Sequence, residues 1–179
     1  MELQRAGPAD VDAARAFLAA ADLTLAGIDS PSVRLWLERD RSGRVVGSTG
    51  WEPSTDGSHA LIRSVAVASD RRASGAGSRL ARHALADAAR SGARRAWLFS
   101  RRSGPFWRSL GFEPADRDEL AAALAATHQV RLFTESGQLG REVAWSRALR
   151  SDGDDGPADP PVGAAPSTPA TTDPPTANH

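Results

Sequence analysis

The sequence predicts an α/β domain with a mixed sheet within residues 1–150. Short apolar segments of strand type alternate with longer segments whose apolar residues recur at helical spacing. A stretch of this length also buries a sizeable core as one domain. Strands interrupted by helices indicate helices packed on a shared sheet.

The first elements are strands, one helix and two turns. We expect a strand at 3–6 and a helix that begins near Pro8, a position where Pro is tolerated. Strands at 33–38 and 45–51 should pair across the turn DRSGR, and the turn STDGSH should lead into a strand at 61–67. The expected apolar face of the helix consists of Val11, Ala14, Phe17 and Leu18.

The later elements alternate in the same way. A helix should run over 75–91, followed by a strand at 96–99 and a short helix at 105–110 that the next residue, a glycine, caps. A helix at 119–127 and a strand at 142–149 complete the domain. The expected buried face of the long helix consists of Leu80, Ala81, Ala84, Leu85 and Ala88.

Charge is divided unevenly along a chain whose formal net charge is zero. All 22 basic residues lie in residues 1–150 together with 17 of the 22 acidic ones, so the body is mildly basic and the tail acidic. Such a body suits an anionic ligand but lacks the dense basic stretches of a nucleic-acid-binding protein. The tail at 151–179 is rich in Pro and has one large apolar residue, so we expect it to be disordered.

Composition excludes several kinds of site. There is no Cys, the four His residues lack metal-ligand spacing, and every basic residue is Arg, so thiolate, metal and catalytic-lysine chemistry are not expected. No apolar run reaches membrane length and the N-terminus lacks a leader pattern. We therefore expect a cytoplasmic protein with no membrane partner.

The most informative segment is SVAVASDRRASGAGSRL at 64–80, which runs from a strand through a basic loop into a helix. The N–H groups at such a helix start are unpaired and, with Arg71 and Arg72 beside them, favour a phosphate or pyrophosphate. The alternative is that the two glycines serve only a turn. The pattern R-x-x-G-x-G matches neither a P-loop nor a dinucleotide fingerprint.

Downstream, FWRSLGF at 106–112 predicts a capped amphipathic helix. Together with the strand at 64–67 and the glycine loop, it resembles the GNAT superfamily of acyl-CoA-dependent N-acyltransferases. Over residues 1–150, GWE (50–52), LIRSVAV (61–67) and the ending at 125–149 are similar to the arsenic-resistance and phosphinothricin-type amino-acid N-acetyltransferase branch. This resemblance implies a mixed, mostly antiparallel central sheet flanked by helices, with acetyl-CoA as cosubstrate.

The resemblance also implies where acetyl-CoA binds. The backbone at 65–67 would pair with the pantetheine arm, and the amides at 72–78 would hold the pyrophosphate at the helix start. An amide near Val65 would polarise the thioester carbonyl, which makes Val65 a catalytic candidate. The implied cofactor-binding residues are Val65, Ala66, Val67, Arg72, Ala73, Ser74, Gly75, Ala76, Gly77, Ser78, Ser100 and Trp107.

One position departs from the family pattern. Many members carry Tyr where this chain has Trp107, and that Tyr protonates the departing thiolate. The chain has no Tyr, and an indole N–H is not a proton donor near neutral pH. Water or Ser109 would then serve after CoA leaves as a thiolate.

Arg63 is the candidate for acceptor binding. It lies in a strand that should be buried, so its charge needs a carboxylate, and Glu52 on the preceding strand is available. In one interpretation the two form a buried bridge that stabilises the sheet. In the other, Arg63 and Ser64 bind the carboxylate or phosphinate-like group of an amino-acid acceptor, while Glu52 takes the amine proton through water.

The histidines give weaker signals. His59 is either a general base or a solvated loop residue, and His83 is a boundary residue on its helix. His128 and Glu135 lie in a segment that could line an acceptor pocket.

The first functional hypothesis is direct acetyl transfer from acetyl-CoA to the primary amine of a small amino acid or amino-acid-like toxin, within a ternary complex. One alternative is a CoA-binding regulatory protein without catalysis, which Trp107 and the acidic tail motivate. Another is a peptide or protein N-terminal acetyltransferase. We expect no nucleic-acid partner, and a homodimer is a candidate assembly.

Overall fold

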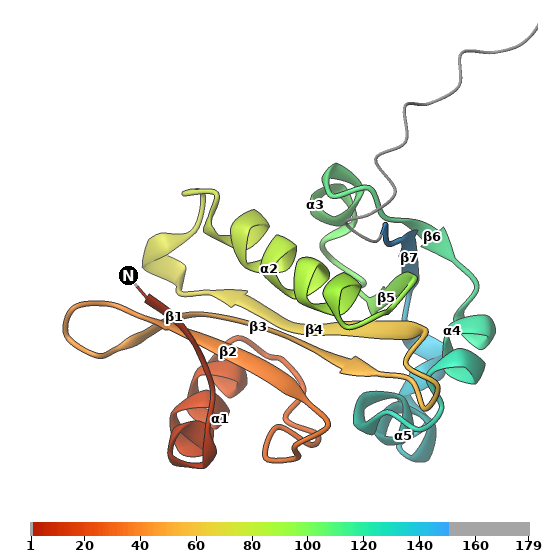
Figure 1. Ribbon diagram of the computed structural model, residues 1–179, viewed down its shortest axis with the longest axis horizontal. Coiled ribbons are helices and arrows are strands. Elements are labelled where there is room, and N and C mark those ends of the chain that lie inside the picture. Colours follow the sequence, from red (N-terminus) through yellow and green to blue (C-terminus); the bar gives the residue numbers. More distant parts are fainter. Residues whose placement is uncertain (1, 151–179) are drawn as a thin grey trace, which may run out of the picture.

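In the computed structural model, which describes residues 2–150, seven strands form one sheet in the order β1-β2-β3-β4-β5-β7-β6 (Figure 1). Only the β4–β5 pair is parallel, and the other neighbours are antiparallel. The strands are β1 (Glu2–Arg5), β2 (Arg34–Arg39), β3 (Val45–Pro53), β4 (His59–Val67), β5 (Arg95–Phe99), β6 (Glu113–Ala115) and β7 (Ala144–Ala148). The expectation of a mixed, mostly antiparallel sheet is confirmed.

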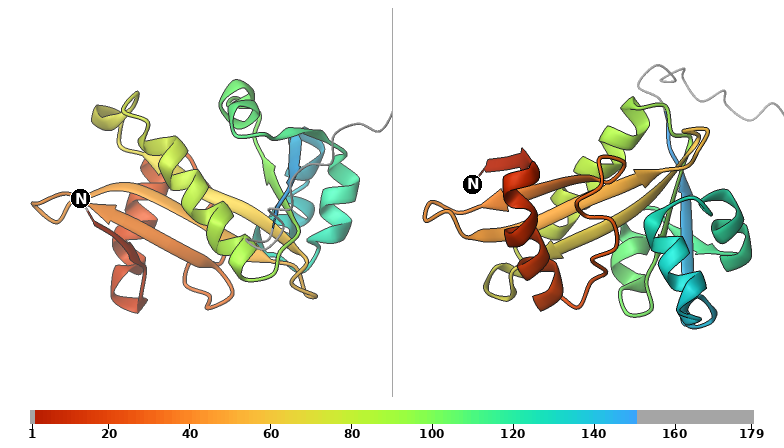
Figure 2. Two further views of the ribbon diagram at one scale, coloured as in Figure 1. Left: turned by 45° about the horizontal axis from the view of Figure 1, so that its top comes forward. Right: turned by 90° about the horizontal axis from the view of Figure 1, so that it is seen from below.

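Within residues 2–150, five α-helices and three short 3-10 turns surround the sheet. The helices are α1 (Val11–Ala20), α2 (Ala76–Arg90), α3 (Gly104–Ser109), α4 (Arg117–Ala123) and α5 (His128–Glu135). The 3-10 turns are η1 (Pro8–Asp10), η2 (Ser69–Arg71) and η3 (Gln138–Arg141). Helices α1 and α2 lie on opposite faces of the sheet, as the two views of Figure 2 show. None of the helices within residues 2–150 has the length and apolarity needed to cross a membrane.

Successive side chains along each strand point to opposite faces of the sheet, so the core is divided between the two faces. Ala60 and Ile62 of β4 pack with α2 and α3, whereas Leu61 faces the cluster under α4 and α5. On β2, Trp36 belongs to the α2 side while Leu35 and Leu37 pack against α1. The buried face of α2 consists of Leu80, Ala81, Ala84, Leu85 and Ala88, which confirms the periodicity of that helix.

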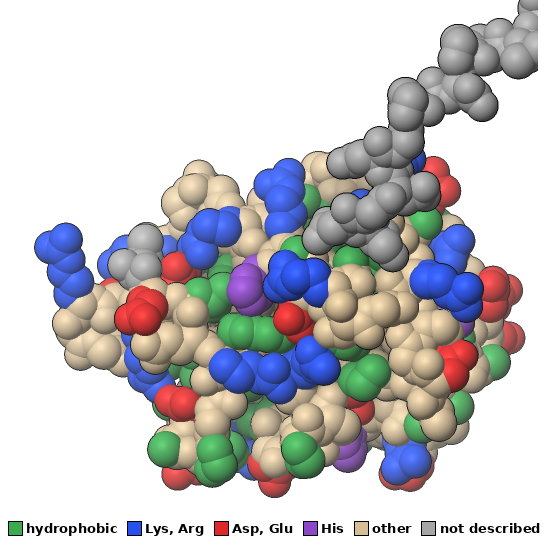
Figure 3. Space-filling model, viewed as in Figure 1, with side chains coloured by type: hydrophobic (Ala, Val, Ile, Leu, Met, Phe, Trp, Pro, Cys, Tyr) green, Lys and Arg blue, Asp and Glu red, His purple; other side chains and the backbone are tan. Residues whose placement is uncertain are grey.

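Several arginines serve the fold by stacking on tryptophan rings. Guanidinium carbons lie 4.9–5.6 Å from the ring centroids in four pairs, Arg5–Trp36, Arg34–Trp51, Arg95–Trp97 and Arg108–Trp145. On the face seen in Figure 3, basic side chains lie among acidic and neutral ones. Part of the arginine content is therefore structural.

Three parts of the secondary structure differ from expectation. Helix α4 ends at Ala123 rather than 127, and α5 and the edge strand β6 were not predicted at all. The expected disordered tail at 151–179 lies outside the described residues, so that prediction and the two-part division of the chain stay predictions.

Candidate active site

The parallel strands β4 and β5 pair at one end only. Their register runs through His59↔Arg95, Ala60↔Ala96 and Leu61↔Trp97 and stops there. From Ile62 onward, the β4 edge that faces β5 has no strand partner within the described residues. Unpaired N–H and C=O groups on such an edge accept an extended ligand as an added strand.

A cavity of about 160 Å³ occupies this gap between the two strands. Its polar residues include Arg63 and Ser64 of β4 and Gln129 of α5, and Trp107 of α3 supplies an aromatic wall. The remaining lining residues are Leu23, Thr24, Ile62, Val65, Leu98, Phe99, Ser100, Ser103 and Phe106.

A β-bulge at Ser64 shapes this part of β4. The register with β3 passes from Gly50↔Arg63 to Ser48↔Ala66, so Ser64 and Val65 stand outside the paired positions. Ser64 has φ +59°, a conformation that costs a non-glycine residue about 1–3 kcal/mol. The hydroxyl of Ser48 donates to the Ser64 carbonyl at 2.6 Å and holds the bulge.

A second hollow, of about 300 Å³, lies at the start of α2. The first intrahelical bond there runs from the Arg79 N–H to the Gly75 carbonyl, which leaves the N–H groups of residues 76–78 without helical acceptors. Phe106 lines both this hollow and the strand cavity, so the two adjoin. The hollow is lined by Val67, Arg71, Arg72, Ala73, Gly75, Gly77, Ser78 and Phe106.

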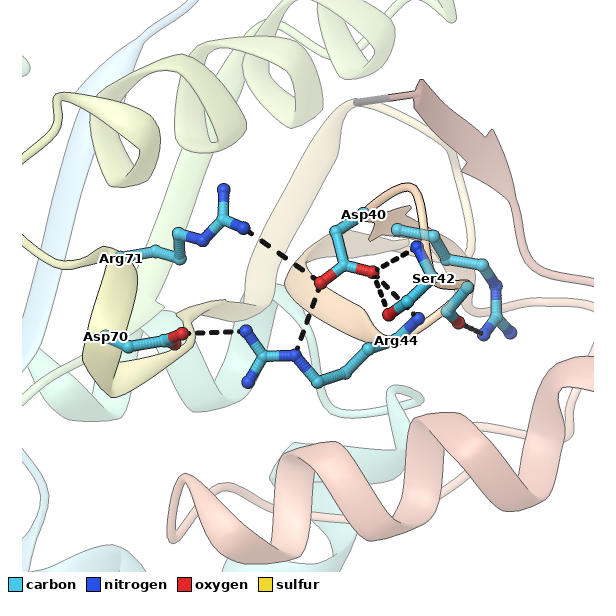
Figure 4. Close-up of polar contacts among 7 residues, drawn as sticks. Asp40, Ser42, Arg44, Asp70 and Arg71 are labelled. Carbon is cyan, nitrogen blue, oxygen red and sulfur yellow. Dashed lines mark hydrogen bonds and ion pairs between the residues drawn. The ribbon is translucent and has the colours of Figure 1, made fainter.

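The loop before α2 is tied to the β2–β3 turn by a network of polar contacts (Figure 4). Arg44 pairs with Asp70 at 2.7 Å and with Asp40 at 3.3 Å, and Arg71 lies 4.0 Å from Asp40. The Ser42 hydroxyl, which donates to Asp40, is the main cause that lowers the pKa of that carboxyl to about 2. The arginine side chains of this network are 39–52% exposed, and ion pairs so accessible to water add little stability.

The bridge between Arg63 and Glu52 is present and buried. An Arg63 guanidinium nitrogen lies 3.2 Å from Glu52 Oε2, and the two side chains are 0% and 2% exposed. Burial lowers the pKa of Arg63, and Glu52 partly offsets that effect. The other oxygen of Glu52 accepts the N–H of His128, the first residue of α5, at 2.6 Å. One carboxylate therefore fixes Arg63 and the start of α5.

An open groove of about 490 Å³ extends outward from the strand cavity. The two share six residues, Leu23, Thr24, Phe99, Ser100, Ser103 and Gln129. Residues 21–25 form one wall, and Leu132 and Phe133 of α5 contribute to the other. Arg101 and Arg102 also line the groove, and Arg101 lies 3.6 Å from Glu142.

Most of the expected site residues come together along β4 and the start of α2. Ser100 lines both the strand cavity and the groove. Ala66 follows the bulge on β4, Ser74 lies in the loop, where its hydroxyl donates to the Arg71 carbonyl, and Ala76 opens α2. Glu52 is not among the residues that line the cavities described above.

Other candidates lie away from the cavity. His59 sits at the closed end of the β4–β5 pair and accepts the Trp97 indole N–H at 3.0 Å. The Ser109 hydroxyl donates to the Phe106 carbonyl. His83 packs edge-on against Trp36, and His128 lies 3.3 Å from the Ser32 hydroxyl. Neither of these two, nor Glu135, lines the cavities described here.

Several residues of the cavity were missed from the sequence, among them Phe106 and Gln129. Phe106 was part of the helix motif without an assigned contact, and Gln129 was not considered. Gln129 follows Thr127, whose residue type is a helix N-cap signal that would have extended the helical prediction to α5. No local signal places its side chain at the cavity.

Comparison with solved structures finds the same fold in several acetyltransferases. N-acetylglutamate synthase from Neisseria gonorrhoeae, complexed with coenzyme A and N-acetyl-glutamate, aligns with a TM-score of 0.63 and 18% identity over 83% of this chain and 35% of that one. This chain therefore spans about a third of that protein. An acetyltransferase of the GNAT family from Staphylococcus aureus aligns with a TM-score of 0.63 and 11% identity, over 83% of this chain and 99% of that one. An aminoglycoside 6'-N-acetyltransferase complexed with coenzyme A aligns with a TM-score of 0.62 and 12% identity, over 86% of this chain and 100% of that one.

Sequence comparison identifies the family. No curated protein matches the chain. The profile of the Acetyltransferase (GNAT) family matches residues 7–112, which run from the η1 turn to the end of FWRSLGF and include strands β2 to β5 and the start of α2. The chain therefore belongs to the GNAT family of acetyltransferases, enzymes that use acetyl-CoA as the acetyl donor.

Proposed function

We propose that this enzyme transfers the acetyl group of acetyl-CoA to the primary amine of a small amino acid or an amino-acid-like molecule, as in the arsenic-resistance and phosphinothricin-type branch. The observation that carries this proposal is the buried guanidinium of Arg63 in the wall of the strand cavity. Arginine binds oxyanions in a two-point geometry, which suits a carboxylate or phosphinate-like group beside the reacting amine.

The proposed place of acetyl-CoA follows the unpaired edge of β4. The pantetheine arm lies along residues 65–67, and the pyrophosphate meets the amides of 72–78 with Arg72 beside them. The Val65 N–H stands outside the register with β3, which supports its role as the donor to the thioester oxygen. In this proposed arrangement the thioester carbon lies at the strand cavity.

In the proposed reaction the amine nitrogen attacks the thioester carbon, a C–N bond forms and the C–S bond breaks. CoA leaves as a thiolate, and the nitrogen gives up a proton to water. Trp107 forms part of the cavity wall and supplies no proton. Positioning of the two reactants therefore supplies much of the rate.

For Glu52 we propose a positioning role in place of proton transfer through water. Both of its carboxylate oxygens already accept hydrogen bonds, one from Arg63 and one from the His128 N–H. Its side chain is also 2% exposed and lines none of the three cavities, whereas a general base must lie within reach of the substrate or of one intervening water. Assembly of this enzyme as a homodimer stays a prediction.

The test follows thiol release from acetyl-CoA with a panel of L-amino acids, the matching amines that lack the carboxylate, and short peptides. We expect amino acids to exceed their carboxylate-free counterparts by at least about tenfold in kcat/KM, the equivalent of one charge-assisted hydrogen bond. Peptide acetylation in preference to amino acids would favour the N-terminal acetyltransferase, and no turnover of any amine would refute the proposal.

A second measurement checks where acetyl-CoA binds. Gly77→Trp should abolish CoA binding in calorimetry, because a Cβ on Gly77 would point toward Phe106 and Val67 in the wall of the hollow. Gly140→Trp is the matched control, since a Cβ there would meet open space. Retained affinity in Gly77→Trp would show that the cofactor binds elsewhere.

A further inference from the structure

Three buried polar atoms in the wall of the strand cavity have no hydrogen-bond partner among the described residues. They are Arg63 Nε, Ser64 Oγ and Gln129 Oε1. The first two come from β4 and the third from α5. A buried polar atom without a partner costs about 1–3 kcal/mol, so a ligand in the cavity that pairs with these three atoms would recover part of that cost.

Gln129 differs from the other two in the kind of group that it offers. Arg63 Nε is a donor and suits an oxyanion, whereas Gln129 Oε1 is an acceptor and suits an N–H. Gln129 is 8% exposed, and no Asp or Glu lines the strand cavity. Its carboxamide is thus the one long polar acceptor side chain among the lining residues of that cavity.

From this arrangement we infer that Gln129 binds the amine of the acceptor, its Oε1 accepting an N–H while Arg63 holds the oxyanion. The inference rests on the proposed amine acetylation. Gln129 lines both the strand cavity and the outer groove, which is where an acceptor would pass from the solvent to the thioester. Because the carboxamide is neutral, it favours the ammonium form less than a carboxylate would, and only the neutral amine is nucleophilic.

The two proposed acceptor contacts are held by a single group. Glu52 bonds Arg63 with one oxygen and the His128 N–H, next to Gln129, with the other. Gln129 also lies outside residues 7–112, the part that matches the family profile. The amine contact therefore belongs to the C-terminal segment of this chain, and the oxyanion contact belongs to the family core.

The test uses two CoA conjugates that need no knowledge of the natural acceptor. In the first, the CoA sulfur carries a CH2–CO linker joined to the nitrogen of glycine. In the second, a methylene replaces that N–H and everything else is unchanged. We expect the full chain to bind the N–H conjugate about tenfold more tightly in calorimetry, the equivalent of one hydrogen bond with a buried acceptor.

Gln129→Leu should bring the two affinities together while CoA itself binds as before. Arg131→Leu, on the exposed side of α5, is the matched control and should keep the tenfold preference. Equal affinities in the unmodified protein, or a preference that survives in Gln129→Leu, would overturn the inference and leave the proposed function standing. Failure of CoA itself to bind would overturn both.

Discussion

Replacing Glu52 with Gln removes the negative charge that compensates Arg63. Both side chains are fully or almost fully buried, so water cannot take the place of the lost carboxylate. The new side chain would have one oxygen and one NH2 group where Glu52 has two oxygens. Its NH2 group would therefore face a donor, either Arg63 or the His128 N–H, and could not accept the hydrogen bond that Glu52 accepts there. Removing one partner of a buried ion pair costs about 3–5 kcal/mol, which is a large part of the total stability of an ordinary domain.

The measurement is the free energy of unfolding from urea titration, with a second pair as the contrast. Asp70→Asn breaks the contact with Arg44, which at 2.7 Å is shorter than the 3.2 Å contact of Arg63, but those side chains are more than half exposed. We expect the Asp70 variant to unfold near the unmodified midpoint, since water solvates the exposed charge.

The outcome that contradicts this reasoning is a Glu52→Gln midpoint no lower than that of Asp70→Asn. Replacing both Glu52 and Arg63 with Leu should recover much of the loss, because neither charge is then buried alone. In the single variant, acceptor binding should weaken more than CoA binding, because Arg63 and the start of α5 both depend on Glu52.

Two further predictions concern backbone strain and pH. Ala73, in the loop before α2, has φ +68°, so Ala73→Gly should raise the free energy of unfolding by about 1 kcal/mol in urea titration. Ala68→Gly, at φ −53°, should lower it instead, and equal effects would contradict the argument. Burial lowers the pKa of His83, whose Nε2 is buried without a partner among the described residues. Because the unfolded chain then binds the proton more readily, stability should fall as the pH drops below about 6.5, and His83→Gln should flatten that part of the curve.

The elements that the sequence predicts well are those whose signals are local. The long helix shows its buried face through spacing alone, and Gly111, the glycine within FWRSLGF, lies at φ +82° just after its helix ends. The turn DRSGR closes through Asp40, which accepts from the N–H of Ser42 and of Arg44. These contacts span a few residues, so composition and order are enough to indicate them.

The parts that were missed depend on distant partners. The N–H at the start of α5 bonds to Glu52, 76 positions earlier in the chain, so no window around 128–135 contains its capping group. Strand β6 has three residues, one of them Pro114, and exists only as an edge on β7. The bulge at Ser64 could not be predicted from the sequence either, because a serine within a strand pattern does not indicate a positive φ.

Strand β4 joins the two halves of the proposed site. Its first three residues pair with β5, and the next six have no partner on that side within the described residues, so in the proposed site one strand carries the oxyanion contact, the bulge and the edge for the cofactor. Pairing along the whole length would satisfy these backbone groups but close the cavity. If acetyl-CoA lies along this edge as proposed, its binding should therefore raise the stability of the protein.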